Sequence, residues 1–199
     1  LTALNISVND EVIVPDLTFV ASPNSVKANK GNPILVDIEK NTLNLDCEKI
    51  EKKISKRTKA IIAVHLYGNI ANIKELKKIS KKYKLYLIED TAEALGSKIN
   101  NKLAGSFGDI SVFSFHETKT LTTGEGGMFL TNNRRIYEKA IIQSNHGRKP
   151  SKHSIFWMDQ IGLKYKISNL QAALGYSQLN RINKIIKKKI QIFKFYKKY

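Results

Sequence analysis

The sequence predicts an α/β fold in which a mostly parallel sheet is covered by helices on both faces. Short apolar runs rich in β-branched and aromatic residues alternate with stretches of helical periodicity, a pattern typical of this fold class. The chain has 199 residues, 42% of them apolar, and a mean hydropathy of −0.30, values typical of a globular domain. Its apolar runs all fall short of the roughly 20 residues that a membrane-spanning helix needs.

Continuous apolar runs predict strands that are buried on both faces of the sheet. They occur at residues 11–14, 34–37, 60–65, 85–89, 110–115 and 128–131. A helix is predicted after the third strand, where Asn72 is the expected N-cap and Glu75 has the spacing of a capping box. Residues 46–54 predict a shorter helix, and a long helical pattern begins at residue 168 and is interrupted near residue 180.

The formal net charge of +17 has two interpretations. Clustered basic residues neutralise phosphates in nucleic-acid-binding proteins. Most of the 34 basic residues here are lysines that spread along the chain, which instead favours solvated helix faces. Because no nucleic-acid-reading motif is present, a basic nucleic-acid-binding protein is the weaker interpretation.

The chain contains a single cysteine, Cys47, so a disulfide framework is excluded and a reducing cytoplasm is compatible with the composition. Cys47 follows Asp46 at a predicted helix start, and we interpret it as structural because the sequence offers it no partner. The four histidines show neither HExxH nor Cys/His zinc spacing, and we therefore expect no metal site.

Two charged residues follow predicted strands, at the edge where ligands bind in such sheets. Asp90 comes after the fourth strand, and Lys119 lies in the loop after the fifth. Each has an ordinary alternative, because Asp90 has the position of a helix N-cap and Lys119 that of a solvated loop lysine. Together they suggest pyridoxal phosphate (PLP), which needs a lysine nucleophile and a carboxylate that keeps its ring nitrogen protonated.

Two further residues have the chemistry that PLP requires around its ring and its phosphate. Phe19, after the first strand, is an aromatic side chain able to stack on the ring, with ordinary core packing as its alternative. Ser114 has a hydroxyl that can bind the phosphate. The glycines between residues 124 and 127 match no nucleotide-binding pattern and predict a tight turn before the sixth strand.

Six segments in order resemble one family, namely EVIVPDLTFVAS, AVHLYGN, IEDTAEALGS, FGDISVFSFHETKTLTTGEGGM, SNHGR and KYKISNLQAALGYSQLNRI. Over essentially the whole chain they resemble the PLP-dependent nucleotide-sugar aminotransferases of the DegT/DnrJ/EryC1/StrS type. EDTAEALGS and TKTLTTGEGGM are most similar to the perosamine synthase branch. The resemblance implies the type I aminotransferase fold, with Lys119 as the cofactor-linked lysine and Asp90 as the partner of the ring nitrogen.

The resemblance also implies cofactor contacts. It assigns Phe19 as the stacking aromatic, Ser114 as a phosphate ligand, and Glu93 as a residue beside the cofactor. Lys166 falls where relatives commonly carry Asn or Arg that reaches the cofactor phosphate of the neighbouring subunit. A lysine retains the positive charge but loses the bidentate fork of arginine. The implied enzyme is a homodimer with a shared active site.

The resemblance further implies amino transfer to a nucleotide-linked 4-keto-6-deoxy sugar, with glutamate as the donor, in the cytoplasm and without a membrane partner. Residues 1–199 would be the PLP-binding large domain, truncated at both ends and without the small C-terminal domain. Relatives that dehydrate sugars have histidine in place of Lys119, so this lysine favours transamination. An inactive fragment of such an enzyme and a nucleic-acid-binding protein are the alternatives.

Overall fold

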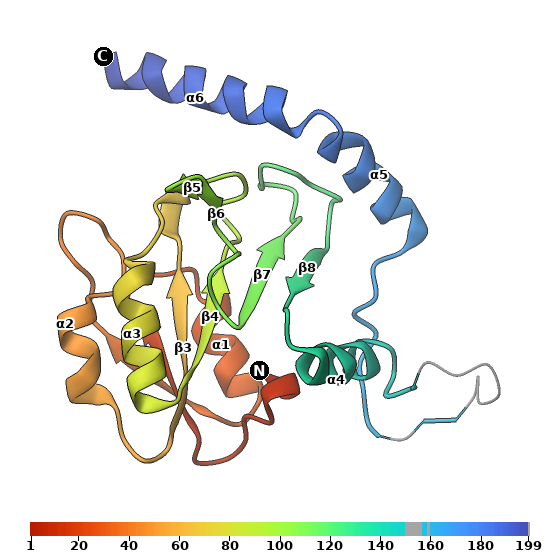
Figure 1. Ribbon diagram of the computed structural model, residues 1–199. Helices are drawn as coiled ribbons and strands as arrows, with labels where there is room; N and C mark the ends of the chain where they lie inside the picture. Colours follow the sequence, from red (N-terminus) through yellow and green to blue (C-terminus); the bar gives the residue numbers. More distant parts are fainter. Residues whose placement is uncertain (150–156, 159, 199) are drawn as a thin grey trace.

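The computed structural model describes residues 1–149, 157–158 and 160–198. The strands of its main sheet span Glu11–Pro15 (β1), Asn32–Val36 (β2), Thr58–Val64 (β3), Tyr86–Asp90 (β4), Ile110–Ser114 (β7) and Gly127–Leu130 (β8). Within the described residues they form a six-stranded sheet in the order β2-β1-β3-β4-β7-β8 (Figure 1). Neighbouring strands are parallel, except that β7 and β8 pair antiparallel.

Helices join most of these strands, and a small hairpin lies outside the main sheet. The helices span Ala21–Ala28 (α1), Cys47–Ile50 (α2), Ile73–Tyr83 (α3), Arg134–Ser144 (α4), Asn169–Leu179 (α5) and Ile182–Lys198 (α6). Single 3-10 turns occupy Thr2–Leu4 (η1), Glu51–Lys53 (η2) and Leu66–Gly68 (η3). The hairpin consists of Lys98–Ile99 (β5) and Lys102–Leu103 (β6).

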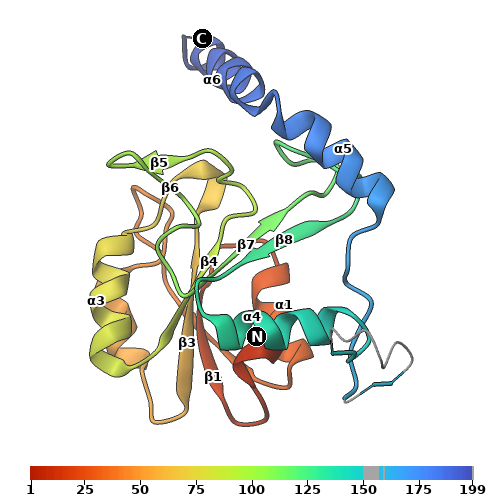
Figure 2. The same ribbon diagram turned by 45° about the vertical axis from the view of Figure 1, so that its right-hand side comes forward.

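Apolar side chains fill both faces of the sheet. On one face, residues such as Ile61 and Leu87 pack with the apolar sides of α2 and α3. On the other, residues such as Ile62 and Ile88 pack with α1 and α4 (Figures 1 and 2). Successive strand residues point to opposite faces, so the uninterrupted apolar runs of the central strands β1 and β3 supply both cores.

Cys47 belongs to the core on the α2 and α3 face, where its side chain is buried. Burial is the main cause that raises the pKa of the thiol to about 12, and the charges of Glu39, Glu75 and Asp46 add to it. The thiol therefore stays protonated at neutral pH, in agreement with a structural role.

The predicted α/β fold, with a mostly parallel sheet between helices, is confirmed. Each predicted strand forms, and the ends differ because pairing with neighbours sets them. The capping box at α3 is only half correct. Asn72 accepts a hydrogen bond from the Glu75 N–H at 3.3 Å, as an N-cap does, but the Glu75 carboxylate pairs with Lys78 at 2.7 Å.

The predicted C-terminal helical segment is present and consists of α5 and α6, which extend beyond the sheet in both views (Figures 1 and 2). Ser168 and Gln171 form a capping box at the start of α5. The interruption occurs at Asn180 and Arg181, close to the predicted position. In the part of the chain that the structure describes, each helix is too short or too polar to cross a bilayer.

Candidate active site

The predicted site residues gather mainly on loops that follow the carboxyl ends of the strands. The strand order reverses at β1, because the chain moves from β1 to β2 in one direction and then to β3 on the other side. Ligands bind beyond the carboxyl ends of parallel strands near such a reversal. Phe19 lies after β1, Asp90 is the last residue of β4, and Lys119 lies in the loop after β7.

Asp90 ends β4 and is held by two hydrogen bonds. The Ser22 hydroxyl donates to Oδ2 at 2.7 Å, and the Ala92 N–H donates to Oδ1 at 3.1 Å. Residues 91–97 form turns and no helix, so the alternative that Asp90 caps a helix is wrong. Ser22 is a buried residue in the first turn of α1 that the sequence prediction missed, although the following Pro23 is a signal of a helix start.

A cavity of about 310 Å³ brings Asp90 and Ser114 together. Ser22 and Ala92 line it beside Asp90, and apolar strand residues such as Val112 form another part of its wall. Ser114 ends β7, and its hydroxyl accepts the N–H of His116 at 3.3 Å. The hydroxyl and the carboxylate therefore border one space of ligand size.

Lys119 differs from the surface lysines. Its side chain is 19% exposed, whereas those of Lys49, Lys78 and Lys82, which form surface ion pairs, are 48%, 63% and 59% exposed. Lys119 Nζ lies 3.5 Å from Glu93 Oε1. A lysine that is largely removed from water and faces a carboxylate is not a solvated loop residue, so that alternative is wrong.

Glu93 is itself fixed by the main chain of a neighbouring loop. The Tyr67 N–H donates to Glu93 Oε2 at 2.9 Å, and the other oxygen, Oε1, is the one that faces Lys119. Tyr67 lies in η3 after β3 and has a φ of +52°, an uncommon conformation for a bulky residue. The sequence prediction missed Tyr67, because a hydrogen bond from a backbone amide has no signal in residue type.

The loop that carries Lys119 is held by α5. The Gln178 side chain donates to the Thr122 carbonyl at 2.6 Å and accepts from the Thr122 N–H at 3.1 Å. The Thr123 N–H donates to the Phe115 carbonyl at 2.9 Å. Gly126 then turns the chain into β8 with a φ of +145°, so the prediction of a turn in the glycine-rich segment is confirmed.

The structure places Phe19 near Asp90 but sets Lys166 apart. Phe19 is 72% exposed, so the alternative of core packing is wrong. Its carbonyl accepts the N–H of Ser22, which in turn donates its hydroxyl to Asp90. Lys166 is exposed, and its N–H donates to the Ser144 carbonyl. In the described part of the chain, its side chain makes no hydrogen bond or ion pair with the other predicted residues.

Two buried hydroxyls beside these residues lack partners within the described chain. Thr18 Oγ1 precedes Phe19 in sequence, and Thr91 Oγ1 follows Asp90. Buried polar atoms are nearly always hydrogen-bonded, so two orphans next to predicted cofactor residues are typical of a site that a ligand completes.

Comparison with known proteins assigns the family. A sequence profile of the DegT/DnrJ/EryC1/StrS aminotransferase family matches residues 1–199. The chain belongs to this family. It is 44% identical over 198 residues to the GDP-perosamine synthase of Escherichia coli O157:H7, a match that covers 100% of this chain and 54% of that protein. The predicted family membership is confirmed.

Solved structures of aminotransferases share the fold. The aminotransferase from Psychrobacter cryohalolentis superposes with a TM-score of 0.86 and 34% identity, covering 91% of this chain and 48% of that one. Spr1654 from Streptococcus pneumoniae, in its PLP-form, superposes with a TM-score of 0.90 and 29% identity, covering 100% of this chain and 55% of that one. The chain therefore spans about half the length of the relatives it matches.

PLP is the cofactor of this family, and the residues at the carboxyl edge fit it. The edge supplies a largely buried lysine, a carboxylate fixed by two donors, and a cavity that joins this carboxylate to a serine hydroxyl. The donor set agrees with a cofactor that carries a ring nitrogen, an aldehyde and a phosphate.

Proposed function

We propose that this chain is the cofactor-binding part of a PLP-dependent aminotransferase that converts a nucleotide-linked 4-keto-6-deoxy sugar to the 4-amino sugar. Glutamate is the proposed amino donor. Family membership and 44% identity to a GDP-perosamine synthase support this reaction class. The lone, buried thiol of Cys47 is compatible with the reducing cytoplasm, where we propose that the enzyme acts.

The observation that carries the proposal is the environment of Lys119. Its side chain is only 19% exposed, its amine lies 3.5 Å from Glu93, and its loop is at the same sheet edge as Asp90. Hydrogen bonds from Ser22 and Ala92 leave Asp90 little freedom to turn. An amine nucleophile and a fixed carboxylate on different strand ends are the two groups that PLP chemistry needs.

The residues divide the work of proton transfer and charge stabilisation. When bound, PLP supplies an electron sink for the negative charge left on a carbon that loses a proton. We assign Lys119 Nζ to accept that proton and to return it to the carbon on the other side of the transferred nitrogen. Glu93 orients the amine through its Oε1, and the Asp90 carboxylate is the proposed partner of a protonated ring nitrogen.

The remaining predicted contacts are proposals about binding. The exposed ring of Phe19 is free to stack on a ligand, and the Ser114 hydroxyl borders the cavity beside Asp90. Lys166 is exposed and is proposed to reach the phosphate in the site of a second subunit, which makes the enzyme a homodimer with shared sites. Mixing Lys119→Ala with Lys166→Ala chains tests this, because one intact site forms in each mixed dimer and restores part of the PLP binding.

Absorption spectroscopy tests the central assignment. The protein is saturated with PLP, and the visible band of the lysine-linked cofactor is compared between wild type, Lys119→Ala and Lys139→Ala. Lys139 is an exposed lysine on α4 and serves as the control. We expect the band in wild type and in Lys139→Ala and its loss in Lys119→Ala. If wild type and Lys119→Ala both lack the band, the chain does not form this linkage and is better described as an inactive fragment.

A further inference from the structure

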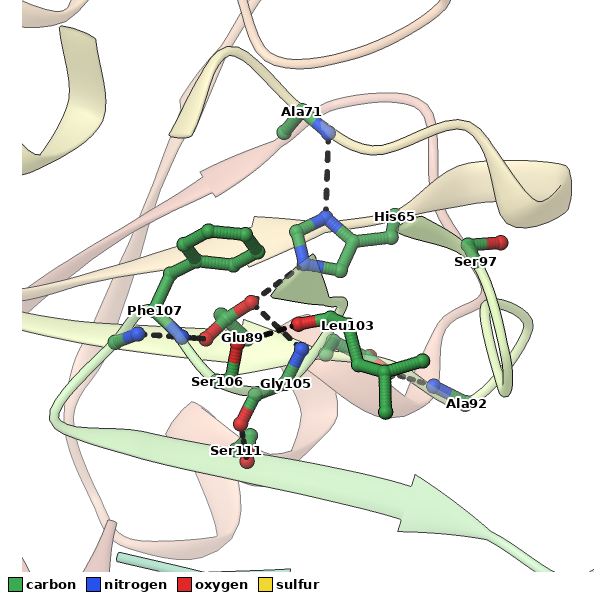
Figure 3. A network of polar contacts seen from close by, with 12 residues as sticks. His65, Ala71, Glu89, Ala92, Ser97, Leu103, Gly105, Ser106, Phe107 and Ser111 are labelled. Carbon is green, nitrogen blue, oxygen red and sulfur yellow. Dashed lines mark hydrogen bonds and ion pairs between the residues drawn. The ribbon is translucent and has the colours of Figure 1, made fainter. Parts of the chain in front are cut away.

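A buried carboxylate adjoins the candidate site along β4. Glu89 immediately precedes Asp90, and its side chain is fully buried. Four donors surround it (Figure 3): the N–H groups of Gly105 at 2.9 Å, Phe107 at 2.7 Å and Gly108 at 2.6 Å, and His65 Nε2 at 2.9 Å. The carboxylate thus joins β4 to the segment before β7 and to the residue that follows β3.

His65 is also fully buried, and its ring nitrogens have different roles (Figure 3). The Ala71 N–H donates to Nδ1 at 3.2 Å, so Nδ1 carries a lone pair and Nε2 carries the proton that is donated to Glu89. Burial acts to raise the pKa of Glu89, but the hydrogen bonds from His65 and the backbone outweigh it and hold this pKa below its ordinary value.

The segment between Gly105 and Gly108 wraps closely around the carboxylate. A Cβ added at Gly108 would lie 2.6 Å from the Leu87 carbonyl oxygen and 3.3 Å from Glu89 Cγ, so only glycine fits there. This segment leads directly into β7, whose far end carries Ser114 and the loop of Lys119. Glu89 therefore fixes the beginning of the strand that presents the proposed lysine.

A second connection runs from the network to Glu93. The Ser97 hydroxyl donates to the Gly68 carbonyl at 2.7 Å. Gly68 follows Tyr67, whose N–H donates to Glu93 at 2.9 Å. His65 holds the beginning of the same loop and, through Nδ1, also its end at residue 71. The loop is thereby fixed on both sides of the Tyr67 amide.

We propose that Glu89 and His65 are positioning residues, which hold the Tyr67 amide where it directs Glu93 toward Lys119. The catalytic meaning of this inference rests on the proposed function. The φ of +52° at Tyr67 supports it, because an uncommon backbone conformation persists only where surrounding contacts over-determine it. Neither residue touches the reacting groups, and both act through the loop.

Glu11 provides a matched control at the other end of the sheet. It begins β1, is 4% exposed and accepts hydrogen bonds from the side chains of Ser55, Arg57 and Thr58. The substitution Glu11→Gln therefore perturbs a buried carboxylate by the same chemical change but leaves the carboxyl edge untouched.

The experiment compares Glu89→Gln with Glu11→Gln by amide hydrogen exchange and by titration with PLP. In wild type, His65 and Gly105 donate to Glu89 Oε2, and Phe107 and Gly108 donate to Oε1. Glutamine has only one acceptor oxygen, so after Glu89→Gln one of these two pairs of donors loses its acceptor. We expect exchange of the Tyr67 amide to become about tenfold faster and the Kd for PLP to rise about tenfold in Glu89→Gln. Glu11→Gln should leave both values within about twofold of wild type.

Two variants of His65 keep the test decisive if Glu89→Gln fails to fold. His65→Gln is long enough to place its NH2 group near the position of Nε2, where it can donate to Glu89. His65→Asn is one carbon shorter, so its amide reaches only the position of Nδ1, where its oxygen can accept from Ala71. We expect His65→Gln to preserve slow exchange at Tyr67 and His65→Asn to lose it. The opposite order would overturn the proposed role of Glu89.

Other outcomes separate this proposal from the function itself. If Glu11→Gln releases the Tyr67 amide as much as Glu89→Gln does, the effect is general destabilisation and the proposal is wrong. If wild type binds no PLP, the proposed function fails, and the exchange rates at Tyr67 alone decide the positioning role.

Discussion

Two buried glutamates lie near opposite ends of the main sheet and are held by different kinds of donor. Glu11, at the amino end of β1, is bound by the side chains of Ser55, Arg57 and Thr58. Glu89, near the carboxyl end of β4, is bound by backbone N–H groups and by His65, which is itself fully buried. Arg57 is 64% exposed, so the amino-end network reaches water whereas the other does not.

The difference in donors indicates that Glu11 stabilises the start of a strand, whereas Glu89 shapes loops beside the candidate site. Arg57, an exposed side-chain donor at Glu11, can rotate toward water if the carboxylate is lost. Backbone donors around Glu89 cannot, because they belong to a loop that has folded around the charge. By our proposal, Glu89 shapes the part of the carboxyl edge where the Tyr67 amide directs Glu93 toward Lys119.

The largest expected effect is on stability. Glu89→Ala leaves the backbone donors and the His65 Nε2–H without an acceptor in the interior, and we expect the free energy of unfolding to fall by about 3–5 kcal/mol. Glu11→Ala should cost about 1–3 kcal/mol, because water can reach Arg57. Urea denaturation of both variants measures the difference. Equal losses would contradict the contrast between the two ends.

The dependence of stability on pH comes next. Hydrogen bonding by Ser55 is the largest cause that lowers the pKa of Glu11, while backbone and His65 hydrogen bonds overcome burial to lower that of Glu89. A lowered folded-state pKa contributes stability above the unfolded value of 4.5, and this contribution is lost as pH falls through the folded value.

We therefore expect the free energy of unfolding to decrease below about pH 5 in wild type. The decrease should be shallower in Glu89→Gln and in Glu11→Gln, since each removes one titrating carboxylate. Urea midpoints between pH 3 and pH 7 provide the measurement, with Glu138→Gln on the exposed face of α4 as the control. An unchanged acid limb in Glu89→Gln would mean that Glu89 has the same pKa in the folded and unfolded protein, which would contradict the lowered folded-state pKa.

A smaller effect is expected where α5 meets the lysine loop. Gln178→Ala removes both side-chain hydrogen bonds to Thr122, and we expect a loss of about 1 kcal/mol in the free energy of unfolding, with faster exchange of the Thr122 amide. Gln191→Ala on the exposed α6 is the control. Matching behaviour of the two variants would show that α5 does not hold the loop.

The central strands β1 and β3 were predictable because they are buried on both faces and form uninterrupted apolar runs. The edge strands β2 and β8 were predicted from similar apolar runs although they are only partly buried. The helix α1 was missed because only Ser22 and Val26 are buried along it, which leaves no apolar stripe. The helix α4 was missed for a similar reason, since Ile136 is its only residue classed as buried. The β5 and β6 strands, with two residues each, are too short to show an alternation.

The site was predictable only where position after a strand carries information. Asp90 and Lys119 were predicted in this way, and family resemblance added Glu93 to the prediction. The bond between His65 and Glu89 joins residues 24 positions apart, and the clamp of Gln178 on Thr122 joins residues 56 apart. No periodicity of the chain encodes such pairs, because they arise when the strands come together.

The most direct test of the central claim is to trap the linkage between the protein and PLP. The complex is reduced with borohydride and digested, and the peptide that carries the pyridoxyl group is identified by mass spectrometry. We expect the label on Lys119, the lysine that is largely buried and faces Glu93. A label spread over the exposed lysines, at similar levels in wild type and in Lys119→Ala, would contradict the assignment of Lys119 as the cofactor lysine.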